Sequence, residues 1–277
     1  GHHSGQSSFD LSTGSERPDP PARSLVPREH GASMELAFPL LGAFALGPPS
    51  TPAIAYAVAA ILAFVSHEAL LVLLGLRGAR QRERMGGAAR RWLLALGSLA
   101  TLLGAPAVYA FSPAARVVTL VPVALALIVL VLTVRGVRER SLGVELLVGA
   151  ALAAVALPVA LECGATLETA VRVTLAWCVA FGVGTLAARG VLYRQKDAGR
   201  GLAVARIVGA LVLLGGIALA LFVPASWPHA LAPAPSAFAA LVLGTRPPPP
   251  TKMRAIGLWL VAASTITLVL LVGGGPS

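Results

Sequence analysis

Long runs of apolar residues, separated by short polar segments, make up almost the whole chain after residue 30. Nine such runs occur, at 31–46, 53–76, 92–111, 117–134, 142–161, 167–188, 202–223, 229–243 and 256–272. A helix needs about 20 apolar residues to cross a hydrocarbon core of roughly 30 Å, with a range of about 17–25. Seven runs reach or nearly reach that length, whereas the first and the eighth are shorter and contain proline. The pattern predicts an all-α, polytopic transmembrane bundle of nine helices, in which the two short runs are also compatible with tilted, kinked or re-entrant segments.

The distribution of Lys and Arg predicts how these helices are oriented. If all nine runs cross the membrane, 19 of the 22 basic residues fall on the side of the N-terminus. The opposite loops carry only Arg116, and Arg172 and Arg206 lie close enough to a span end to reach the interface. Because positively charged loops stay in the cytoplasm, we expect nine spans with the N-terminus inside and the C-terminus outside.

Composition excludes several classes of protein. The chain is 56% hydrophobic and only 12% charged, whereas soluble domains are roughly 45–50% apolar and about 25% charged. A soluble enzyme, a secreted disulfide scaffold and a disordered protein are therefore excluded. The net charge of +10 lies in short clusters between the apolar runs, which indicates contact with a lipid bilayer and not with nucleic acid.

The first 29 residues differ from the rest of the chain. Ser, Gly, Pro and both charge signs occur there without an apolar period, which predicts a disordered arm over 1–29 ahead of a transmembrane domain over 30–274. The opening Gly1-His2-His3 has no initiator methionine and is typical of a tag remnant or a truncated record.

Ionisable residues inside the apolar runs are the candidate functional groups, because a charge costs roughly 2.5–3.5 kcal/mol at a helix centre on insertion scales. His67 and Glu68 adjoin in the second run, and Glu68 precedes Arg77 by nine residues. At about 1.5 Å per residue, that spacing puts Glu68 near the middle of the membrane. Two interpretations stay open: a ligand, proton or ion site that faces other helices, or a structural carboxyl that is protonated or hydrogen-bonded across the bundle.

Two further acidic residues lie at a shallower depth on the same side. Glu35 and Glu145 are about one helical turn into the first and fifth runs, and His30 precedes the first. Each carboxylate also has a simpler explanation, because the helix dipole favours negative charge near a helix N-terminus. Taken together, these positions predict a polar cavity open to the cytoplasm that binds a small anionic or lipidic ligand and is lined by His30, Glu35, His67, Glu68 and Glu145.

Basic residues surround the expected mouth of this cavity, at Arg138, Arg140, Arg189 and Arg194. Arginine binds phosphate and carboxylate groups through two parallel hydrogen bonds, which suits an anionic headgroup. The same residues also serve as topology determinants that contact anionic lipid. The chain's two cysteines have no zinc or haem spacing, and neither a metal nor a cofactor is predicted.

A short motif directly before the first run carries a family resemblance. The stretch Pro27–Met34 (PREHGASM) resembles the opening motif of the YwiC-like family of bacterial integral membrane proteins, in which proline, a basic residue, an acidic residue or glutamine, histidine, glycine and alanine precede the first helix. Phe38–Gly42 and Leu70–Leu76 are also similar to that family. Ser33 departs from the tryptophan expected there. The resemblance is expected to cover residues 27–274, and it implies a multi-spanning protein of the bacterial inner membrane.

A more distant similarity is to the UbiA-type prenyltransferases, whose bundle also has about nine helices and a cytoplasmic polar cavity. That chemistry requires two Asp-rich clusters that hold Mg²⁺, because a hard cation prefers several carboxylate oxygens. The aspartates here are Asp10, Asp19 and Asp197 alone, so no Asp-rich pair exists. The leading hypothesis is a non-enzymatic membrane protein that binds or moves its ligand. The alternatives are a UbiA-like transferase with a degenerate metal site and an accessory subunit of a membrane complex.

Overall fold

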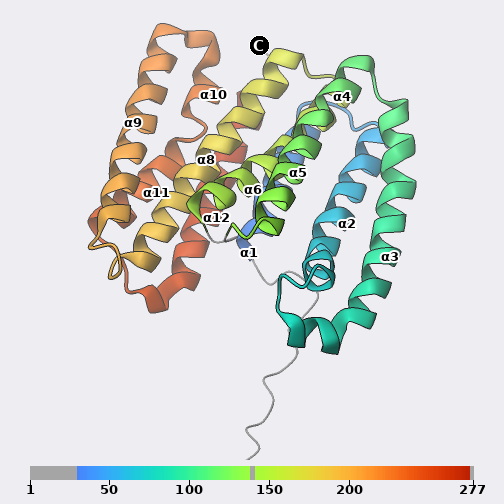
Figure 1. The fold of residues 1–277 in the computed structure, drawn as a ribbon. Helices are drawn as coiled ribbons and strands as arrows, with labels where there is room; N and C mark the ends of the chain where they lie inside the picture. The colour runs from blue at the N-terminus through green and yellow to red at the C-terminus, as the bar shows by residue number, and fades with distance from the viewer. Residues whose placement is uncertain (1–29, 138–140, 275–277) are drawn as a thin grey trace, which may run out of the picture.

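The computed structural model describes residues 30–137 and 141–274, and this part of the chain is a bundle of helices without a strand (Figure 1). The predicted N-terminal arm, 1–29, lies outside the described residues. The helices, in chain order, are α1 (His30–Phe44), α2 (Thr51–Leu73), α3 (Ala79–Ala110), α4 (Pro113–Val118), α5 (Leu120–Val134), α6 (Leu142–Ala154), α7 (Ala156–Glu162), α8 (Leu167–Tyr193), α9 (Arg200–Phe222), α10 (Trp227–Leu231), α11 (Ala234–Thr245) and α12 (Met253–Gly273). Two 3-10 turns, Pro224–Ser226 and Pro250–Lys252, precede α10 and α12.

Every apolar run of the sequence forms one helix or two consecutive helices. Within the described residues, seven helical segments are long and apolar enough to cross a membrane, counting α4–α5 and α6–α7 each as one segment. The first and eighth runs form shorter apolar helices, Ser33–Phe44 within α1 and Ala234–Thr245. The all-helical, multi-pass prediction is confirmed, while the count of nine spans stays a prediction.

Prolines set the positions where two of the segments break. Helix α4 ends at Val118, four residues before Pro122, and α6 ends at Ala154, four residues before Pro158. Proline has no N–H to bond the carbonyl four residues earlier, and its ring clashes with that carbonyl. Each break therefore follows from the sequence and divides one span into two short helices in line.

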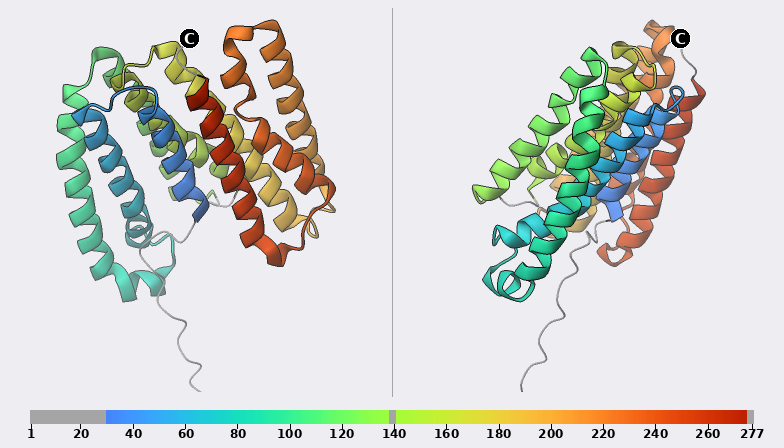
Figure 2. Two further views of the ribbon diagram at one scale, coloured as in Figure 1. Left: turned by 180° about the vertical axis from the view of Figure 1, so that it is seen from behind. Right: turned by 90° about the vertical axis from the view of Figure 1, so that its right-hand side faces the viewer.

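Successive spans run up and down, so the turns gather at two ends of the bundle (Figures 1 and 2). The α2–α3, α8–α9 and α11–α12 turns lie at the lower end in Figure 1, and the turns α3–α4, α7–α8 and α9–α10 lie at the upper end. We call the lower end the basic end, because most of the described Lys and Arg belong to its turns and helix ends. Helix α1 begins toward the basic end and α12 finishes toward the opposite end.

Small residues allow the helices on the C-terminal side to pack closely. A Cβ added to Gly209 of α9 would lie 2.9 Å from the Ala237 carbonyl oxygen of α11. A Cβ added to Gly216 would lie 2.6 Å from the Ala230 carbonyl oxygen of α10. Membrane helices associate through such close backbone contacts, because lipid tails are as apolar as the side chains. Gly209 and Gly216 therefore have a packing role.

The α2–α3 hairpin is joined to the bundle unevenly along its length. At the opposite end, buried residues of α2 and α3 share a core with α1, α4 and α7, in which the Tyr56 and Phe111 ring centres are 5.4 Å apart. Toward the basic end, the buried cluster around Ala69, Val72 and Ala89 draws on α2 and α3 alone. The hairpin is thus anchored at one end of the bundle and packs mainly against itself at the other.

Candidate polar site near the basic end

Glu68 forms a two-pronged ion pair with Arg77, which follows α2. Arg77 Nε donates to Glu68 Oε1 at 2.8 Å, and Arg77 Nη2 donates to Oε2 at 2.6 Å. Both side chains are half-buried, with 16% of Glu68 and 23% of Arg77 exposed. A bidentate pair of this kind is among the stronger hydrogen-bonded contacts in proteins. Glu68 is therefore paired within the described structure.

Glycines in the turn after α2 make this pairing possible. Helix α2 ends at Leu73, and Gly75 and Gly78 adopt φ values of +75° and +97°, which other residues rarely tolerate. The chain reverses here, so Arg77 folds back beside Glu68. Glu68 lies five residues before the last residue of α2, about 8 Å along the axis. This is shallower than the mid-membrane depth expected from a helix that continues to Arg77.

The His67 side chain points in a different direction from the Glu68 side chain. Its side chain is exposed, while Ser66 and Ala69 form the buried face of α2 at this level. Successive residues of an α-helix diverge by roughly 100°, so His67 and Glu68 do not share one direction. His30, the other histidine of the expected cavity, begins α1, and its side chain lies outside the described part.

A second ion pair joins Glu145, in the first turn of α6, to Arg189, near the end of α8. Arg189 Nη1 donates to Glu145 Oε2 at 2.8 Å. The Arg189 guanidinium also lies 5.0 Å from the centre of the Tyr193 ring, and Lys196 Nζ lies 5.9 Å from the same ring. Cations over an aromatic face are stabilised by the ring quadrupole. Arg189 is therefore held by a carboxylate and an aromatic ring together.

Glu35 approaches the same place from α1. A Cβ added to Gly149 of α6 would lie 3.5 Å from Glu35 Oε2, so the carboxylate rests against this glycine. Gly149 is four residues after Glu145, and residues with this spacing lie on one face of a helix. The Glu35 carboxylate thus lies against α6 about one helical turn from the Glu145–Arg189 pair, and we call these three residues the polar cluster.

Only part of the expected anion rim lies within the described residues. Arg194 Nη1 donates to the Pro247 carbonyl at 3.3 Å, which ties the end of α8 to the α11–α12 connection. Arg138 and Arg140 lie outside the described residues. Arg77 is the residue that the sequence interpretation missed, because it was assigned to the α2–α3 loop. The glycines on either side of Leu76-Arg77 were the available signal for a reversal.

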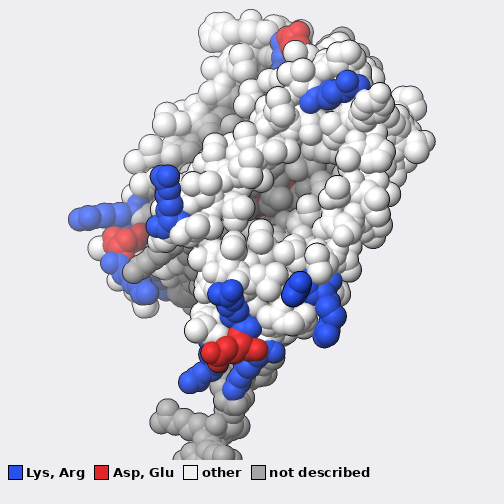
Figure 3. All heavy atoms as spheres, turned by 45° about the vertical axis from the view of Figure 1, so that its right-hand side comes forward, with Lys and Arg blue, Asp and Glu red and all other residues white. Residues whose placement is uncertain are grey.

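The bundle is hollowed on the side that α5 and the α2–α3 hairpin border (Figure 3). Acidic side-chain atoms are visible at the floor of this hollow, and Lys and Arg gather mainly toward the lower half of the same view. The hollow follows from the uneven attachment of the hairpin, whose basic half packs mainly against itself. When the bundle lies in a membrane, the hollow opens toward the lipid acyl chains. The lower rim of the hollow lies near the basic end.

The described residues contain no group of three His, Cys, Asp or Glu side chains placed to hold a metal ion. Asp197, the one aspartate in this part of the chain, accepts hydrogen bonds from the backbone N–H groups of Gly199 and Gly201, both at 3.0 Å. It caps the start of α9 and is already satisfied by the backbone.

Comparison with known proteins supports the family resemblance over one part of the chain. Residues 26–161 match the family described as YwiC-like protein, which confirms the resemblance for the region from before α1 to α7. That region includes Glu35, Glu68, Arg77 and Glu145, whereas Arg189 follows it. None of the curated proteins and none of the solved structures compared with the chain matches it.

Proposed function

We propose that this chain, whose residues 26–161 belong to the YwiC-like family, binds or moves a small anionic or lipidic molecule in the bacterial inner membrane. It would cross the membrane nine times, with the N-terminus inside and the C-terminus outside. The binding region would be the hollow that faces the cytoplasmic half, with Glu35 and the pairs Glu68–Arg77 and Glu145–Arg189 as its polar groups.

The observation that carries this proposal is the presence of two Arg–Glu pairs among apolar helices. Arg77 and Arg189 are each held by a carboxylate at hydrogen-bonding distance and are only 23% and 24% exposed. A guanidinium fork binds phosphate or carboxylate of a ligand in the same way that it binds a glutamate. An incoming anion replaces the glutamate on the arginine and meets a site that is already arranged for it.

The shape of the bundle favours a ligand with an apolar tail. The hollow opens on the side of the bundle (Figure 3), where acyl chains lie around a membrane protein. An amphiphile that enters from this side keeps its tail in hydrocarbon while its headgroup reaches the arginines. The hairpin's single attachment, at the opposite end, leaves its basic half able to move outward and admit such a molecule.

Titration of the detergent-purified chain with dodecyl phosphate tests the proposal. We expect saturable binding, measured by calorimetry or by a rise in Tm, and weaker binding by a factor of about 10–100 in Arg77→Ala or Arg189→Ala. That range corresponds to the loss of one hydrogen-bonded charged contact, roughly 1.5–3 kcal/mol. Arg135→Ala is the matched control, because Arg135 is an exposed arginine at the end of α5.

The same preparation separates the other functions. Mg²⁺-dependent release of diphosphate from a prenyl diphosphate, lost in Glu68→Gln, would favour a transferase. Stoichiometric co-purification of other membrane proteins, unaffected by Arg77→Ala and Arg189→Ala, would favour an accessory subunit. Equal binding of dodecyl phosphate to the wild type and to both arginine variants contradicts the proposed site.

A further inference from the structure

Helix α3 presents an outer face that the rest of the bundle leaves uncovered. Only 6% of its apolar stretch is buried, the smallest share among the seven candidate spans of the described chain. Its buried residues are Ala89 and Ala107, on the side toward α2 and α4. At the far end of the outer face, 82% of Tyr109 is exposed. This helix therefore meets lipid, or another molecule, along most of its length.

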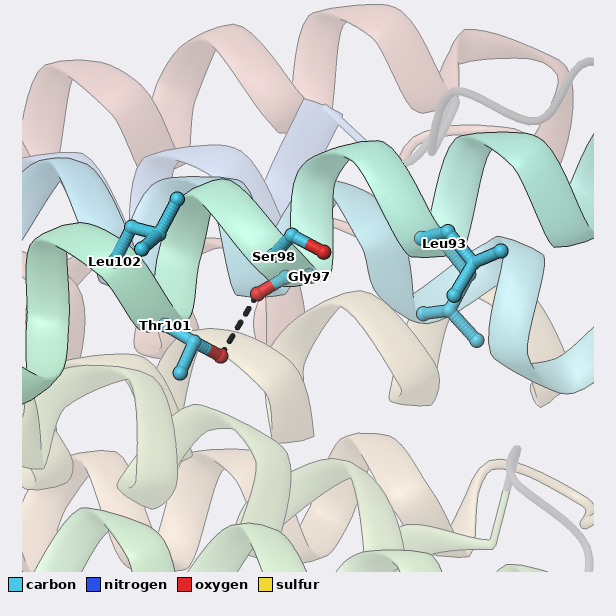
Figure 4. A pocket seen from close by; sticks show the side chains of 6 residues that line it. Leu93, Gly97, Ser98, Thr101 and Leu102 are labelled. Atoms are coloured by element: carbon cyan, nitrogen blue, oxygen red, sulfur yellow. Dashed lines mark hydrogen bonds between the residues drawn. The ribbon is translucent and has the colours of Figure 1, made fainter.

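A shallow groove runs along this face near the middle of the helix (Figure 4). Its lining residues are Leu93, Leu94, Gly97, Ser98, Thr101 and Leu102. The floor consists of small residues, and the Thr101 hydroxyl is turned inward because it donates to the Gly97 carbonyl at 2.8 Å. Leu93 and Leu94 stand one helical turn before this floor and Leu102 one turn after it, so the small residues form a shallow apolar depression between leucines on the lipid-facing side of the helix (Figure 4).

Two exposed arginines lie at the end of the groove that is nearer to the basic end. Arg90 precedes Leu93 by three residues and Gly97 by seven, and Arg91 precedes Leu94 and Ser98 by the same spacings. Residues three and seven apart share a face of an α-helix. Arg90 and Arg91 therefore lie on the same face of α3 as the groove, one turn beyond Leu93 and Leu94, at the end of the apolar stretch where lipid headgroups are found.

We propose that an anionic phospholipid occupies this face, with its phosphodiester at Arg90 and Arg91 and one acyl chain in the groove over Gly97. Along this face two cations are followed by an apolar surface, which matches the order of headgroup and tail in a phospholipid. Each basic residue near an anionic headgroup contributes about 1 kcal/mol. A zwitterionic phospholipid has the same tail but carries no net charge, so it gains less from the arginines.

The charges also argue against a second copy of the chain as the occupant. Two copies in one membrane have the same orientation, so a two-fold contact along α3 brings the arginines of both copies to the same level. Like charges that face each other oppose this contact. A phospholipid neutralises the same arginines. The phospholipid site on α3 is separate from the hollow of the proposed function. An experiment can therefore contradict one proposal without contradicting the other.

Native mass spectrometry of the delipidated full chain, titrated with phosphatidylglycerol or phosphatidylcholine, tests the inference. We expect one phosphatidylglycerol to bind with at least about tenfold preference, as two basic contacts allow. The preference should disappear in Arg90→Ala/Arg91→Ala and persist in Arg135→Ala/Arg254→Ala, which removes two exposed arginines of the same end elsewhere.

A second variant blocks the groove without removing charge. A Cβ added to Gly97 meets no atom within 4 Å, so Gly97→Leu is expected to fold normally and fill the groove between Leu93 and Leu102. It should reduce phosphatidylglycerol binding about tenfold while size-exclusion profile and helicity stay unchanged. Equal binding of phosphatidylglycerol and phosphatidylcholine to the wild type overturns the inference. A wild-type dimer that the Gly97→Leu substitution dissociates also overturns it, because a second copy would then occupy the groove.

Discussion

The carboxylate of Glu35, on α1, rests against Gly149, on α6, in the space that a side chain would otherwise fill. The contact matters because Gly149 lies one turn beyond Glu145, whose partner Arg189 comes from α8. This glycine thus leaves room for the Glu35 carboxylate about one turn of α6 from the Glu145–Arg189 pair. The polar cluster depends on backbone space as much as on the charges themselves.

Replacing this glycine by a large residue should therefore separate the cluster. Gly149→Leu displaces the Glu35 carboxylate and overfills the α1–α6 contact, so we expect a loss of about 1–3 kcal/mol in the free energy of unfolding. Thermal unfolding in detergent, followed by circular dichroism, measures this loss. Gly149→Ala should be milder, because its Cβ would make only an ordinary 3.5 Å contact.

Gly143→Leu provides the control on the same helix. A Cβ at Gly143 meets nothing within 4 Å, so the same increase in size should leave the Tm nearly unchanged. If both leucine variants lose the same stability, the effect belongs to α6 in general, and the proposed contact with Glu35 is not its cause.

The Glu68–Arg77 pair makes a second prediction, which concerns coupling. Arg77→Ala leaves a half-buried carboxylate without its guanidinium, so we expect the free energy of unfolding to fall by about 1.5–3 kcal/mol. Adding Glu68→Gln to this variant removes the unpaired charge and should recover part of the loss. A double-mutant cycle from chemical denaturation gives the interaction energy directly.

Additive losses in the free energy of unfolding would contradict the Glu68–Arg77 ion pair. If the losses of Arg77→Ala and Glu68→Gln simply add in the double variant, the two side chains do not interact in the folded protein. Arg80→Ala serves as the comparison, because Arg80 is an exposed arginine just beyond the same turn.

The sequence was sufficient for the helices and insufficient for the site. Run length and hydropathy predict each helix, and Pro122 and Pro158 explain breaks that a run of apolar residues does not reveal. The partner of Glu68 depended on the reversal at Gly75 and Gly78, a local backbone conformation and not a pattern of polarity. Hydropathy marks residues as intramembrane but does not say which helices become neighbours.

The polar cluster shows the same limit at longer range. The sequence singled out Glu35, Glu145 and Arg189 as candidates, but it assigned Arg189 to a rim and not to a carboxylate 44 positions earlier. That pairing requires α6 and α8 to pack side by side, and this packing is decided by small residues distributed over several helices. Single residues were therefore recognisable, whereas their partners were not.

A third prediction concerns the opposite end of the bundle, where two loops touch. A Cβ added to Gly47 would lie 2.0 Å from the Cys163 carbonyl oxygen, which no side-chain adjustment relieves. Gly47→Ala should therefore push apart the α1–α2 and α7–α8 connections and lower the Tm. The thiol of Cys163 reports this change, because it is 2% exposed in the folded chain.

Maleimide labelling of Cys163 in a Cys178→Ala background gives the measurement. Burial is the main cause that raises the pKa of the Cys163 thiol, and the Glu162 carboxylate raises it further. Since the thiolate is the reactive form, labelling near pH 7.5 should be slow and should accelerate as the pH rises toward the raised pKa. We expect Gly47→Ala to label several-fold faster at the same pH, while Gly143→Ala, which adds the same Cβ on α6 where no atom lies within 4 Å, serves as the comparison. Equal rates in all three proteins would show that Gly47 does not hold the loops together.

The last prediction concerns the orientation of the bundle in the membrane. Most of the described basic residues lie in the turns α2–α3, α8–α9 and α11–α12 or in the helix ends beside them, and such segments remain in the cytoplasm. GFP fused after Asp197 should therefore be fluorescent, and alkaline phosphatase fused at the same position should be inactive. After Gly164 or Gly274, GFP should be dark and alkaline phosphatase active. The short helices α1 and α11 decide the result, because the loss of either span reverses the side of everything that follows it. A fusion after Gly274 that is fluorescent while the Gly164 fusion has active phosphatase would show that an odd number of the later spans does not cross.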